Sequence, residues 1–243
     1  MTIYQGGKLR HGQRIADVIT RITNERLPNH DGIVVPFAGM LHVARRLPFR
    51  CPMQVSDISS DIVAFWSELQ AGWEPPSEIS SDEYHQLRKQ PPSALKTFAC
   101  FACSYNGKEW GGYRPRKLEG CRNRVLQARE QFQLAEVLSA FVFPDWPIPT
   151  NKVVYLDPPY RNNRIGGRFA KFDTEAFWKR AREWVDAGNL VFVSEWEAPD
   201  DWECVWETTM SCGHSNRSKQ FPDRVYVCSG LKLIEHVNKT HHE

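Results

Sequence analysis

The sequence predicts an α/β fold with a mostly parallel β-sheet, an antiparallel C-terminal edge and a small inserted subdomain. Two observations carry this prediction. Short apolar runs alternate with amphipathic helical patterns at both ends of the chain, and strands that alternate with helices form parallel sheets. Between them, prolines, glycines, aromatic residues and cations replace this pattern. We therefore predict a core of residues 1–72 and 130–243 that is interrupted by an insert of residues 73–129.

Strand and helix patterns follow one another through the N-terminal part of the core. Apolar side chains recur at helical spacing over residues 12–26, and Pro28 ends this helix because proline cannot continue the hydrogen-bond ladder. The apolar run 32–37 predicts a buried strand, and residues 53–57 predict a second strand that ends on an acid. Residues 61–69 then place their large apolar side chains on one helical face.

The same alternation returns in the C-terminal part. Residues 152–156 predict a buried strand, residues 173–187 a helix that Gly188 stops, and residues 189–195 another buried strand. Two further strand-like runs, 204–210 and 223–229, are separated by a polar loop. We expect this last pair to form an antiparallel hairpin at the edge of the sheet.

The overall charge excludes a globally basic protein. Lys and Arg number 31 against 29 Asp and Glu, a formal net charge of +2, so a polyanionic partner has to be met by a local patch. Residues 108–129 supply such a patch, with seven cations, two anions and hence a local charge of +5. This run is a candidate surface for phosphates, and its alternative is a solvated helix face.

The cysteines and the apolar runs indicate the compartment. Seven cysteines, an odd number, and a start without a signal pattern predict a protein of a reducing compartment, and no apolar run approaches the roughly 18 residues of a membrane span. Cys100 and Cys103 form a C-x-x-C, with Cys121 downstream, which is one part of a zinc pattern. A structural zinc site closes with four ligands, and no second pair is present, so we expect buried core cysteines and no metal.

Three predicted strands end in residues that suit a ligand site. In an open parallel sheet, ligands bind outside the carboxyl ends of the strands, near the point where the strand order reverses. Gly39 after the first strand allows close backbone approach, Asp57 after the second can bind ribose hydroxyls, and residues 157–160 (DPPY) follow the third. Each feature alone is more often structural than functional. In this order and spacing they predict a nucleoside-binding pocket.

The DPPY segment predicts a rigid polar tip. A residue before proline is held extended and proline has no N–H to donate, so Asp157 and Pro158 are fixed as acceptors beside the Tyr160 ring. Two acceptors and one flat face suit the exocyclic amine of a planar base, whose delocalised lone pair they help to make available. The alternative is an ordinary proline-rich turn. This chemistry needs no metal.

These residues resemble the Dam-type DNA adenine-N6 methyltransferases, which use S-adenosylmethionine, and the resemblance covers most of the chain. DPPY matches the catalytic motif of that family, and the other motifs occur in the family's order. They are YQGGK (4–8), PFAGM (36–40), SDIS (56–59), SYNGKEWGGYR (104–114), FPDW (143–146) and DRVYV (223–227). The resemblance implies a Rossmann-like S-adenosylmethionine-dependent methyltransferase fold, with residues 73–129 as the target-recognition insert.

The resemblance also implies roles for individual residues. The lysine of the N-terminal motif, Lys8, would reach the methionine carboxylate of the cofactor, Asp57 would bind the ribose, and Asp145 would bind the adenine. The cofactor-binding residues so implied are Tyr4, Lys8, Pro36, Phe37, Ala38, Gly39, Asp57, Ile58, Asp145, Trp146 and Asp157. The catalytic residues so implied are Asp157, Pro158, Pro159 and Tyr160.

DNA contacts are expected from the insert and from the polar loop before the last strand. Residues 104–114 look like the DNA-contacting hairpin of the family, and the cations of the basic run would hold phosphates. The side chains expected at the DNA are Tyr105, Asn106, Lys108, Trp110, Tyr113, Arg114, Arg116, Asn216, Arg217 and Lys219. For the hairpin residues, the alternative is packing inside the insert.

We therefore expect a monomeric, cytoplasmic enzyme of a bacterium or a phage-infected host, without membrane association. It would transfer a methyl group from S-adenosylmethionine to N6 of an adenine flipped out of double-stranded DNA. Its context, whether restriction-modification, phage protection or regulation, stays open. Three alternatives stay open, namely N4 methylation of cytosine, methylation of RNA adenine, and a DNA- or cofactor-binding decoy without catalysis. The decoy stays open because Met40 and Leu41 stand where the family often has further glycines.

Overall fold

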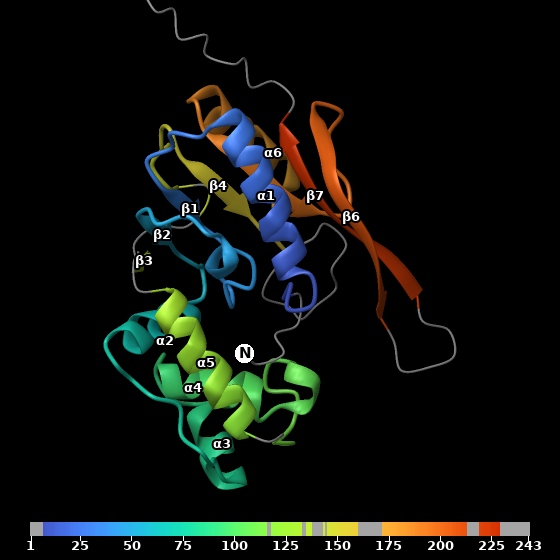
Figure 1. The fold of residues 1–243 in the computed structure, drawn as a ribbon. Helices are drawn as coiled ribbons and strands as arrows, with labels where there is room; N and C mark the ends of the chain where they lie inside the picture. Colours follow the sequence, from blue (N-terminus) through green and yellow to red (C-terminus); the bar gives the residue numbers. More distant parts are fainter. Residues whose placement is uncertain are drawn as a thin grey trace, which may run out of the picture.

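One sheet of seven strands organises the residues that the computed structural model describes, which are 7–115, 118–132, 135–137, 143, 145–159, 172–212 and 219–228. In chain order the strands are β1 (Ile33–Val35), β2 (Met53–Val55), β3 (Ala135–Val137), β4 (Val153–Leu156), β5 (Leu190–Glu195), β6 (Trp202–Cys212) and β7 (Lys219–Cys228). Across the sheet their order is β3-β2-β1-β4-β5-β7-β6 (Figure 1).

The strand directions confirm the predicted fold class. Neighbouring strands are parallel from β3 through β5, and β7 is antiparallel to both β5 and β6. The strand order reverses between β1 and β4, because β2 and β3 extend the sheet on one side and the later strands extend it on the other. The chain thus has a Rossmann-like α/β fold, and the carboxyl ends of β1 and β4 flank the point where such sheets bind ligands.

Helices cover both faces of the sheet. The α-helices of the described residues are α1 (Gly12–Arg26), α2 (Ser60–Gln70), α3 (Ser81–Leu87), α4 (Ala94–Ala102), α5 (Leu118–Gln131) and α6 (Thr174–Asp186), with 3-10 turns η1 (Ala44–Arg46) and η2 (Tyr105–Gly107). The three helices predicted in the core are thus α1, α2 and α6. Asp173 caps α6, because its Oδ1 accepts a hydrogen bond from the Ala176 backbone N–H at 3.0 Å. None of the described helices is long and apolar enough to cross a membrane.

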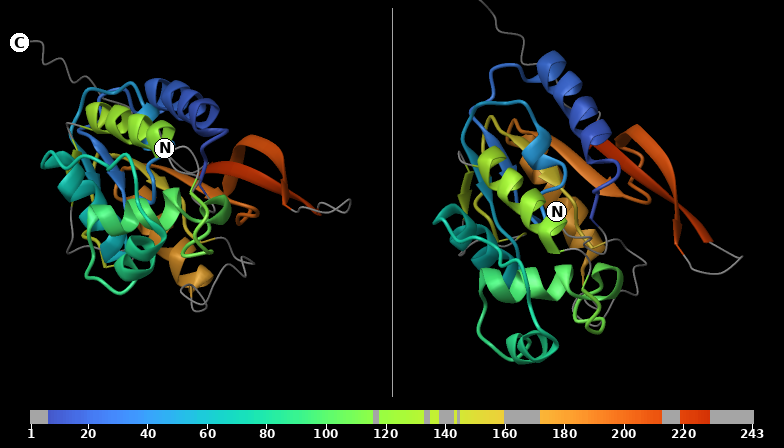
Figure 2. Two further views of the ribbon diagram at one scale, coloured as in Figure 1. Left: turned by 90° about the horizontal axis from the view of Figure 1, so that it is seen from below. Right: turned by 60° about the horizontal axis from the view of Figure 1, so that its bottom comes forward.

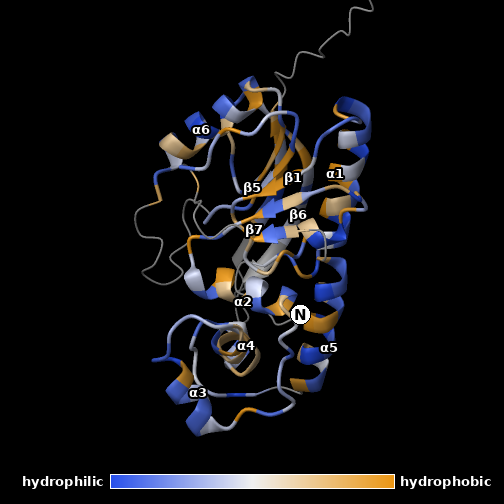
Figure 3. Cartoon of the chain, turned by 90° about the vertical axis from the view of Figure 1, so that its left-hand side faces the viewer, coloured by the Kyte–Doolittle hydropathy of each residue, from blue (hydrophilic) through white to orange (hydrophobic). Residues whose placement is uncertain are grey.

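Side chains of the central strands alternate between two hydrophobic cores. Val153 and Tyr155 of β4 belong to the core on the α1 face, whereas Val154 and Leu156 belong to the core on the α6 face. Figure 3 shows these apolar strands lying between α1 and α6. Since side chains of a strand alternate between faces, the next residue on the α1 face is Asp157.

The insert packs against the core through α2 and α4. Figures 1 and 2 show α2, α3 and α4 gathered at one end of the sheet. Trp73, at the start of the insert, contacts Phe65 of α2 and Phe98 of α4, with ring centroids 6.2 and 6.1 Å apart. Lys96 of α4 pairs with Asp61 of α2 at 3.2 Å. The buried residues of the insert thereby belong to the same hydrophobic cluster as the α1 face of the sheet.

Candidate active site

The catalytic-motif segment begins where β4 ends. Leu156 is the last residue of this strand, and the chain continues through Asp157, Pro158 and Pro159, while Tyr160 lies outside the described residues. The whole of β4 is buried, as its apolar sequence requires. The Asp157 side chain is 21% exposed, so its carboxylate lies at the rim of the core and not inside it.

Lys8 brings a buried positive charge to this carboxylate. It lies in the turn before α1, where its carbonyl accepts hydrogen bonds from the backbone N–H groups of His11 (3.2 Å) and Gly12 (2.6 Å). Its Nζ lies 3.2 Å from Asp157 Oδ1 and also 3.2 Å from Asp223 Oδ1. Lys8 is only 3% exposed and Asp223 is completely buried. The turn before α1, the end of β4 and β7 therefore meet at one ion-pair cluster.

The cluster keeps Lys8 charged. Burial alone would lower the pKa of Lys8, because an ammonium is poorly solvated inside a protein, but Asp157 and Asp223 outweigh burial and raise this pKa above its ordinary 10.5. The neighbouring Tyr155 hydroxyl is 2.8 Å from the Ser194 hydroxyl, and burial followed by the charge of Asp157 raises the pKa of Tyr155 well above its ordinary value. At neutral pH the site thus holds a cationic lysine beside a neutral tyrosine.

The loop of residues 36–40, here called the cofactor loop, follows β1 and is held from two sides. Gly39 adopts a left-handed φ of 44°, which suits glycine. Its N–H donates to Asp57 Oδ2 at 2.9 Å, and its carbonyl accepts from Trp66 Nε1 of α2 at 2.8 Å. Phe37 and Gly39 are half-buried, while the loop residues Pro36, Ala38 and Met40 are buried.

Asp57, predicted to bind a ribose, organises the backbone around it. Besides the bond from Gly39, its Oδ1 accepts the Ser59 N–H at 2.9 Å. A carboxylate oxygen has two lone-pair sites, so these bonds are compatible with a further donor such as a ribose hydroxyl. The adjacent Ile58 is 71% exposed, which presents an apolar face next to the acid.

The FPDW segment lies against the cofactor loop through one of its aromatic residues. The Phe143 and Phe37 ring centroids are 5.5 Å apart. Trp146 is 3% exposed and belongs to the core under α6, where its carbonyl accepts from Arg180 Nη2 at 2.8 Å. Asp145 is exposed. Phe143, not Trp146, is therefore the aromatic residue of this segment at the loop.

This set of residues fits S-adenosylmethionine. A buried ammonium at Lys8 suits its carboxylate, and a left-handed glycine turn permits close backbone approach. Asp57 with the exposed Ile58 suits a ribose and the flat face of an adenine. These groups lie at the carboxyl ends of β1, β2 and β4. Tyr4, which the resemblance also implies, lies outside the described residues.

Two solved structures align with most of the chain. One is a proposed methyltransferase from Escherichia coli, which aligns with 88% of this chain and 84% of its own, at 12% identity and a TM-score of 0.39. The other is a proposed methylase from Haemophilus influenzae, with 88% of each chain aligned, 14% identity and a TM-score of 0.38. No protein-family model and no curated protein matches the chain. The function is therefore inferred from the residues of the site.

Residues 103–114 of the insert form a hairpin closed by backbone bonds. Ser104 and Tyr113 form an antiparallel bridge, and the Arg114 N–H donates to the Cys103 carbonyl at 2.6 Å. Asn106 and Trp110 adopt left-handed φ angles of 52° and 46° within it. The predicted DNA-contacting segment is thus an ordered hairpin of this chain, which we call the 103–114 hairpin.

The side chains predicted at the DNA divide between the interior of the insert and its surface. Trp110 and Tyr113 pack on Tyr84 of α3, with ring centroids 5.0 and 5.5 Å away, and the Tyr113 hydroxyl donates to the Ile79 carbonyl at 2.7 Å. On the surface are Tyr105, Lys108 and Arg114, with Asn106 half-buried. The Arg114 guanidinium lies 5.4 Å from the centroid of the Tyr105 ring.

The basic run is partly neutralised by an acid outside it. Arg122 donates to Glu74 at 2.8 Å and to the Pro75 carbonyl at 2.9 Å, and Arg129 lies 3.7 Å from the same glutamate. These two cations tie α5 to the start of the insert, so the local charge of +5 overstates what a phosphate would meet. Arg116, Asn216 and Arg217 lie outside the described residues, and of Lys219 only the backbone is described, in β7.

Cys100, Cys103 and Cys121 are buried between α4 and α5. Burial and the nearby Cys121 raise the pKa of Cys103 to about 11, so its thiol is neutral at physiological pH. Among the described residues, no group of three His, Cys, Asp or Glu side chains could hold a metal ion.

Sequence reasoning missed two residues of the site, Asp223 and Trp66. DRVYV was recognised as a closing strand, but Asp223 alternates with Val225 and Val227, which are buried on the α1 face. An acid in phase with buried valines was the signal for a buried charge and its partner. Trp66 was assigned to the apolar face of its helix, and nothing in the spacing indicated that its indole N–H would hold Gly39.

Proposed function

We propose that the chain is an S-adenosylmethionine-dependent methyltransferase that modifies N6 of adenine in double-stranded DNA. The observation that carries the proposal is the Asp157 carboxylate, partly exposed at the end of β4 and bound to the buried Lys8. The cofactor loop with Asp57, at the ends of β1 and β2, supports it, since it lies beside the same reversal of strand order.

Lys8, Asp157 and Pro158 would have different roles in the reaction. When bound, S-adenosylmethionine supplies an electrophilic methyl group on a sulfonium. Lys8 would bind its carboxylate, and because Lys8 also contacts Asp157, donor binding and the orientation of Asp157 are coupled. Asp157 and the Pro158 carbonyl would accept hydrogen bonds from the adenine amine and direct its lone pair at the methyl carbon. The amine nitrogen would take the methyl group as the S–C bond breaks, the bonding pair would stay on the sulfur, and the nitrogen would release one proton to solvent.

The target amine has to leave the base stack before this geometry can form. Flipping costs a few kcal/mol, which phosphate contacts by the surrounding surface have to offset. Lys108 and Arg114 on the 103–114 hairpin are exposed cations of the insert that suit this task. Tyr160, directly after Pro159, would supply the stacking face.

The structure gives the decoy alternative no specific support. Met40 and Leu41 are each 3% exposed and belong to the core, so their side chains point away from the ligand-facing side of the cofactor loop. Leu41 has a φ of 49°, a conformation that glycine adopts readily. Leu41, directly after the cofactor loop, therefore keeps a glycine-like backbone conformation although it is not a glycine.

The test is transfer of label from radiolabelled S-adenosylmethionine to unmethylated DNA, with Asp157→Ala as the variant. We expect labelled N6-methyladenine after nuclease digestion, and an activity about 100- to 1,000-fold lower in the variant because it loses a contact that orients the amine. Calorimetry should show cofactor binding retained within about tenfold, since Lys8 keeps Asp223 as its partner. Asp173→Ala, which removes only the α6 cap, is the matched control.

Other outcomes assign the other functions. Label in N4-methylcytosine or only in RNA would change the assigned substrate, although methyl transfer would still be the activity. A gel shift on DNA without any label would favour the decoy. Equal activity of Asp157→Ala and the unaltered protein would remove Asp157 from the reaction.

A further inference from the structure

We propose that Asp223 is a positioning residue that holds the Lys8 ammonium for the donor and makes the site prefer a cationic donor over its neutral product. The inference rests on the proposed function and deepens it. Asp223 has no place in the reaction described above. It is nevertheless completely buried and in direct contact with Lys8.

The fold places Asp223 and Asp157 on the same face of the sheet. Asp223 alternates with Val225 and Val227 along β7, and both valines belong to the α1-face core. Asp157 follows Tyr155 in the same phase along β4. Strand β5 lies between β4 and β7, so the two carboxylates approach from either side of it, and the Lys8 ammonium bridges them at 3.2 Å from each.

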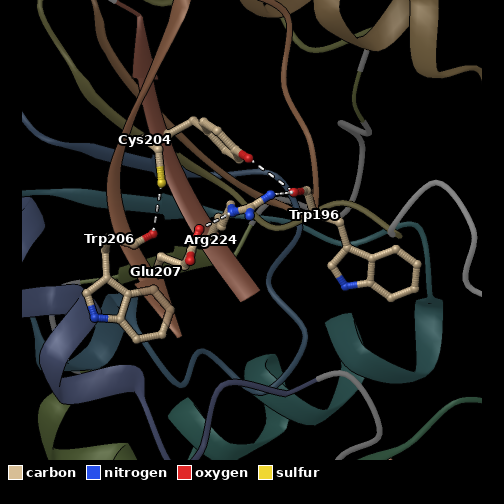
Figure 4. Close-up of polar contacts among 6 residues, drawn as sticks. Trp196, Cys204, Trp206, Glu207 and Arg224 are labelled. Atoms are coloured by element: carbon tan, nitrogen blue, oxygen red, sulfur yellow. Dashed lines mark hydrogen bonds and ion pairs between the residues drawn. The ribbon is translucent and has the colours of Figure 1, made fainter. Parts of the chain in front are cut away.

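Contacts on the opposite face fix β7, and hence Asp223, against the end of β5. Arg224 pairs in register with Glu195, donates from Nη1 to the Trp196 carbonyl at 2.8 Å, and forms an ion pair with Glu207 of β6 (Figure 4). The Tyr226 hydroxyl donates to the same carbonyl at 3.1 Å. The Asp223 carboxylate is therefore carried by a doubly anchored strand and not by a free loop.

The charges of the cluster do not cancel. Lys8 contributes one positive charge and the two carboxylates two negative charges, so the cluster carries a net charge of −1. S-adenosylmethionine, with a sulfonium, an ammonium and a carboxylate, has a net charge of +1, and its product, a thioether, has none. Loss of the sulfonium charge therefore weakens attraction to the cluster, which favours the donor on entry and the departure of the product.

Asp223 contributes to this preference without touching the substrate. Its side chain is buried at 0% exposure, whereas the Asp157 side chain, at 21%, reaches the rim. Removing the Asp223 charge would leave Lys8 and Asp157 as a neutral pair. The cluster would then attract the sulfonium less and repel the cofactor carboxylate less, so donor and product should become more alike in affinity.

The experiment measures the dissociation constants of S-adenosylmethionine and S-adenosylhomocysteine by calorimetry for the unaltered protein and for Asp223→Asn. In the variant, we expect the preference for S-adenosylmethionine over S-adenosylhomocysteine, given by the ratio of the two constants, to fall about tenfold. This is the size of one partly screened charge interaction. Asp223→Glu, which keeps the charge, should restore the original ratio. Glu207→Gln, which breaks an ion pair on the other face of the same strands, is the matched control and should leave the ratio unchanged.

A second measurement needs no variant. An amine analogue of the cofactor, with a protonated amino group in place of the sulfonium, should bind the unaltered protein more tightly than S-adenosylhomocysteine. An unchanged ratio in folded Asp223→Asn, or a thioether that binds as tightly as the amine analogue, would overturn the inference and leave the proposed function standing. If the unaltered protein binds none of the three ligands, both proposals fall.

Discussion

His42, two residues after the cofactor loop, is a buried residue whose environment disfavours its charged form. Its side chain is 4% exposed, and its Nε2 has no hydrogen-bond partner among the described residues. Burial, with smaller effects of Arg45 and Arg46, lowers the pKa of His42 from 6.5 to about 3. The native protein therefore keeps this imidazole neutral over a pH range in which the unfolded chain would protonate it.

The stability of the protein should therefore fall with acid through His42. The contribution is complete above pH 6.5 and is lost as the pH falls from 6.5 towards 3, because only the unfolded state binds the proton there. Between pH 6.5 and pH 5 the loss is about 1.7 kcal/mol, because the slope is half of 1.36 kcal/mol per pH unit at pH 6.5 and approaches that value below it. Urea unfolding at the two pH values should show this difference in the unaltered protein and a correspondingly smaller one in His42→Leu. His85→Gln, at an exposed position of α3, is the control, and equal slopes in all three proteins would contradict the prediction.

Asp57 and Asp157 could be predicted as site residues because each follows a recognisable strand, whereas Lys8 was predicted only from the resemblance of residues 4–8 to a family motif. Sequence spacing could not predict their contacts, since the Lys8–Asp157 ion pair joins residues that are far apart in the chain. The sequence carried a signal for a buried charge at Asp223, but its partner Lys8 is also far away in the chain and could not be identified. Tyr113 was predicted at the DNA or inside the insert, and its packing on Tyr84 together with its bond to the Ile79 carbonyl anchors it within the insert.

At the scale of elements, α5 and the 103–114 hairpin share the basic run but use its cations differently. Arg122 of α5 is committed to Glu74 and the Pro75 carbonyl, whereas the Arg114 side chain is exposed and lies over the Tyr105 ring. A cation that binds a phosphate releases a counterion, so its removal changes how binding depends on salt. A cation that holds a helix in place affects stability instead.

Arg114→Ala should weaken DNA binding and reduce the slope of log affinity against log salt by about 1, the value for one phosphate contact. Arg122→Ala is the matched control from the same run, and we expect it to lower the melting temperature while leaving the slope unchanged. Fluorescence anisotropy with a labelled duplex between low and moderate salt measures both slopes. If Arg114→Ala keeps the original slope, the hairpin is not the surface that meets the DNA.

The elements of the core were predictable because they are long or strongly apolar, as α1, β4 and β5 illustrate. Strand β3 was not predicted, since Ala135–Val137 is a three-residue edge strand of mixed polarity. The sequence indicated the insert by its change in composition but did not predict its helices. Their formation depends on local signals such as the capping box of Ser80 and Glu83 at α3, and on packing against α2 that periodicity does not reveal.

At the scale of the whole molecule, the insert and the sheet share one hydrophobic core. Phe98 of α4 is 1% exposed and contacts Trp73, which contacts Phe65 of α2. Phe65 lies against Trp66, the residue that holds the cofactor loop, with ring centroids 5.1 Å apart. The insert is thus connected to the cofactor loop by a continuous chain of packed rings.

This continuity predicts that the chain unfolds in one cooperative transition. Phe98→Ala in the insert should lower the free energy of unfolding by about 3–5 kcal/mol, the cost of a large cavity, and so should Phe177→Ala of α6 on the other face of the sheet. Both variants should lower the melting temperature of a single transition whose calorimetric and van't Hoff enthalpies agree. We expect one transition because the elements of either core pack on the same sheet, so neither core is stable without the other. If Phe98→Ala instead produces an early step while the main transition stays where it was, the insert folds independently, and its hold on the cofactor loop through Trp66 is weaker than the packing implies.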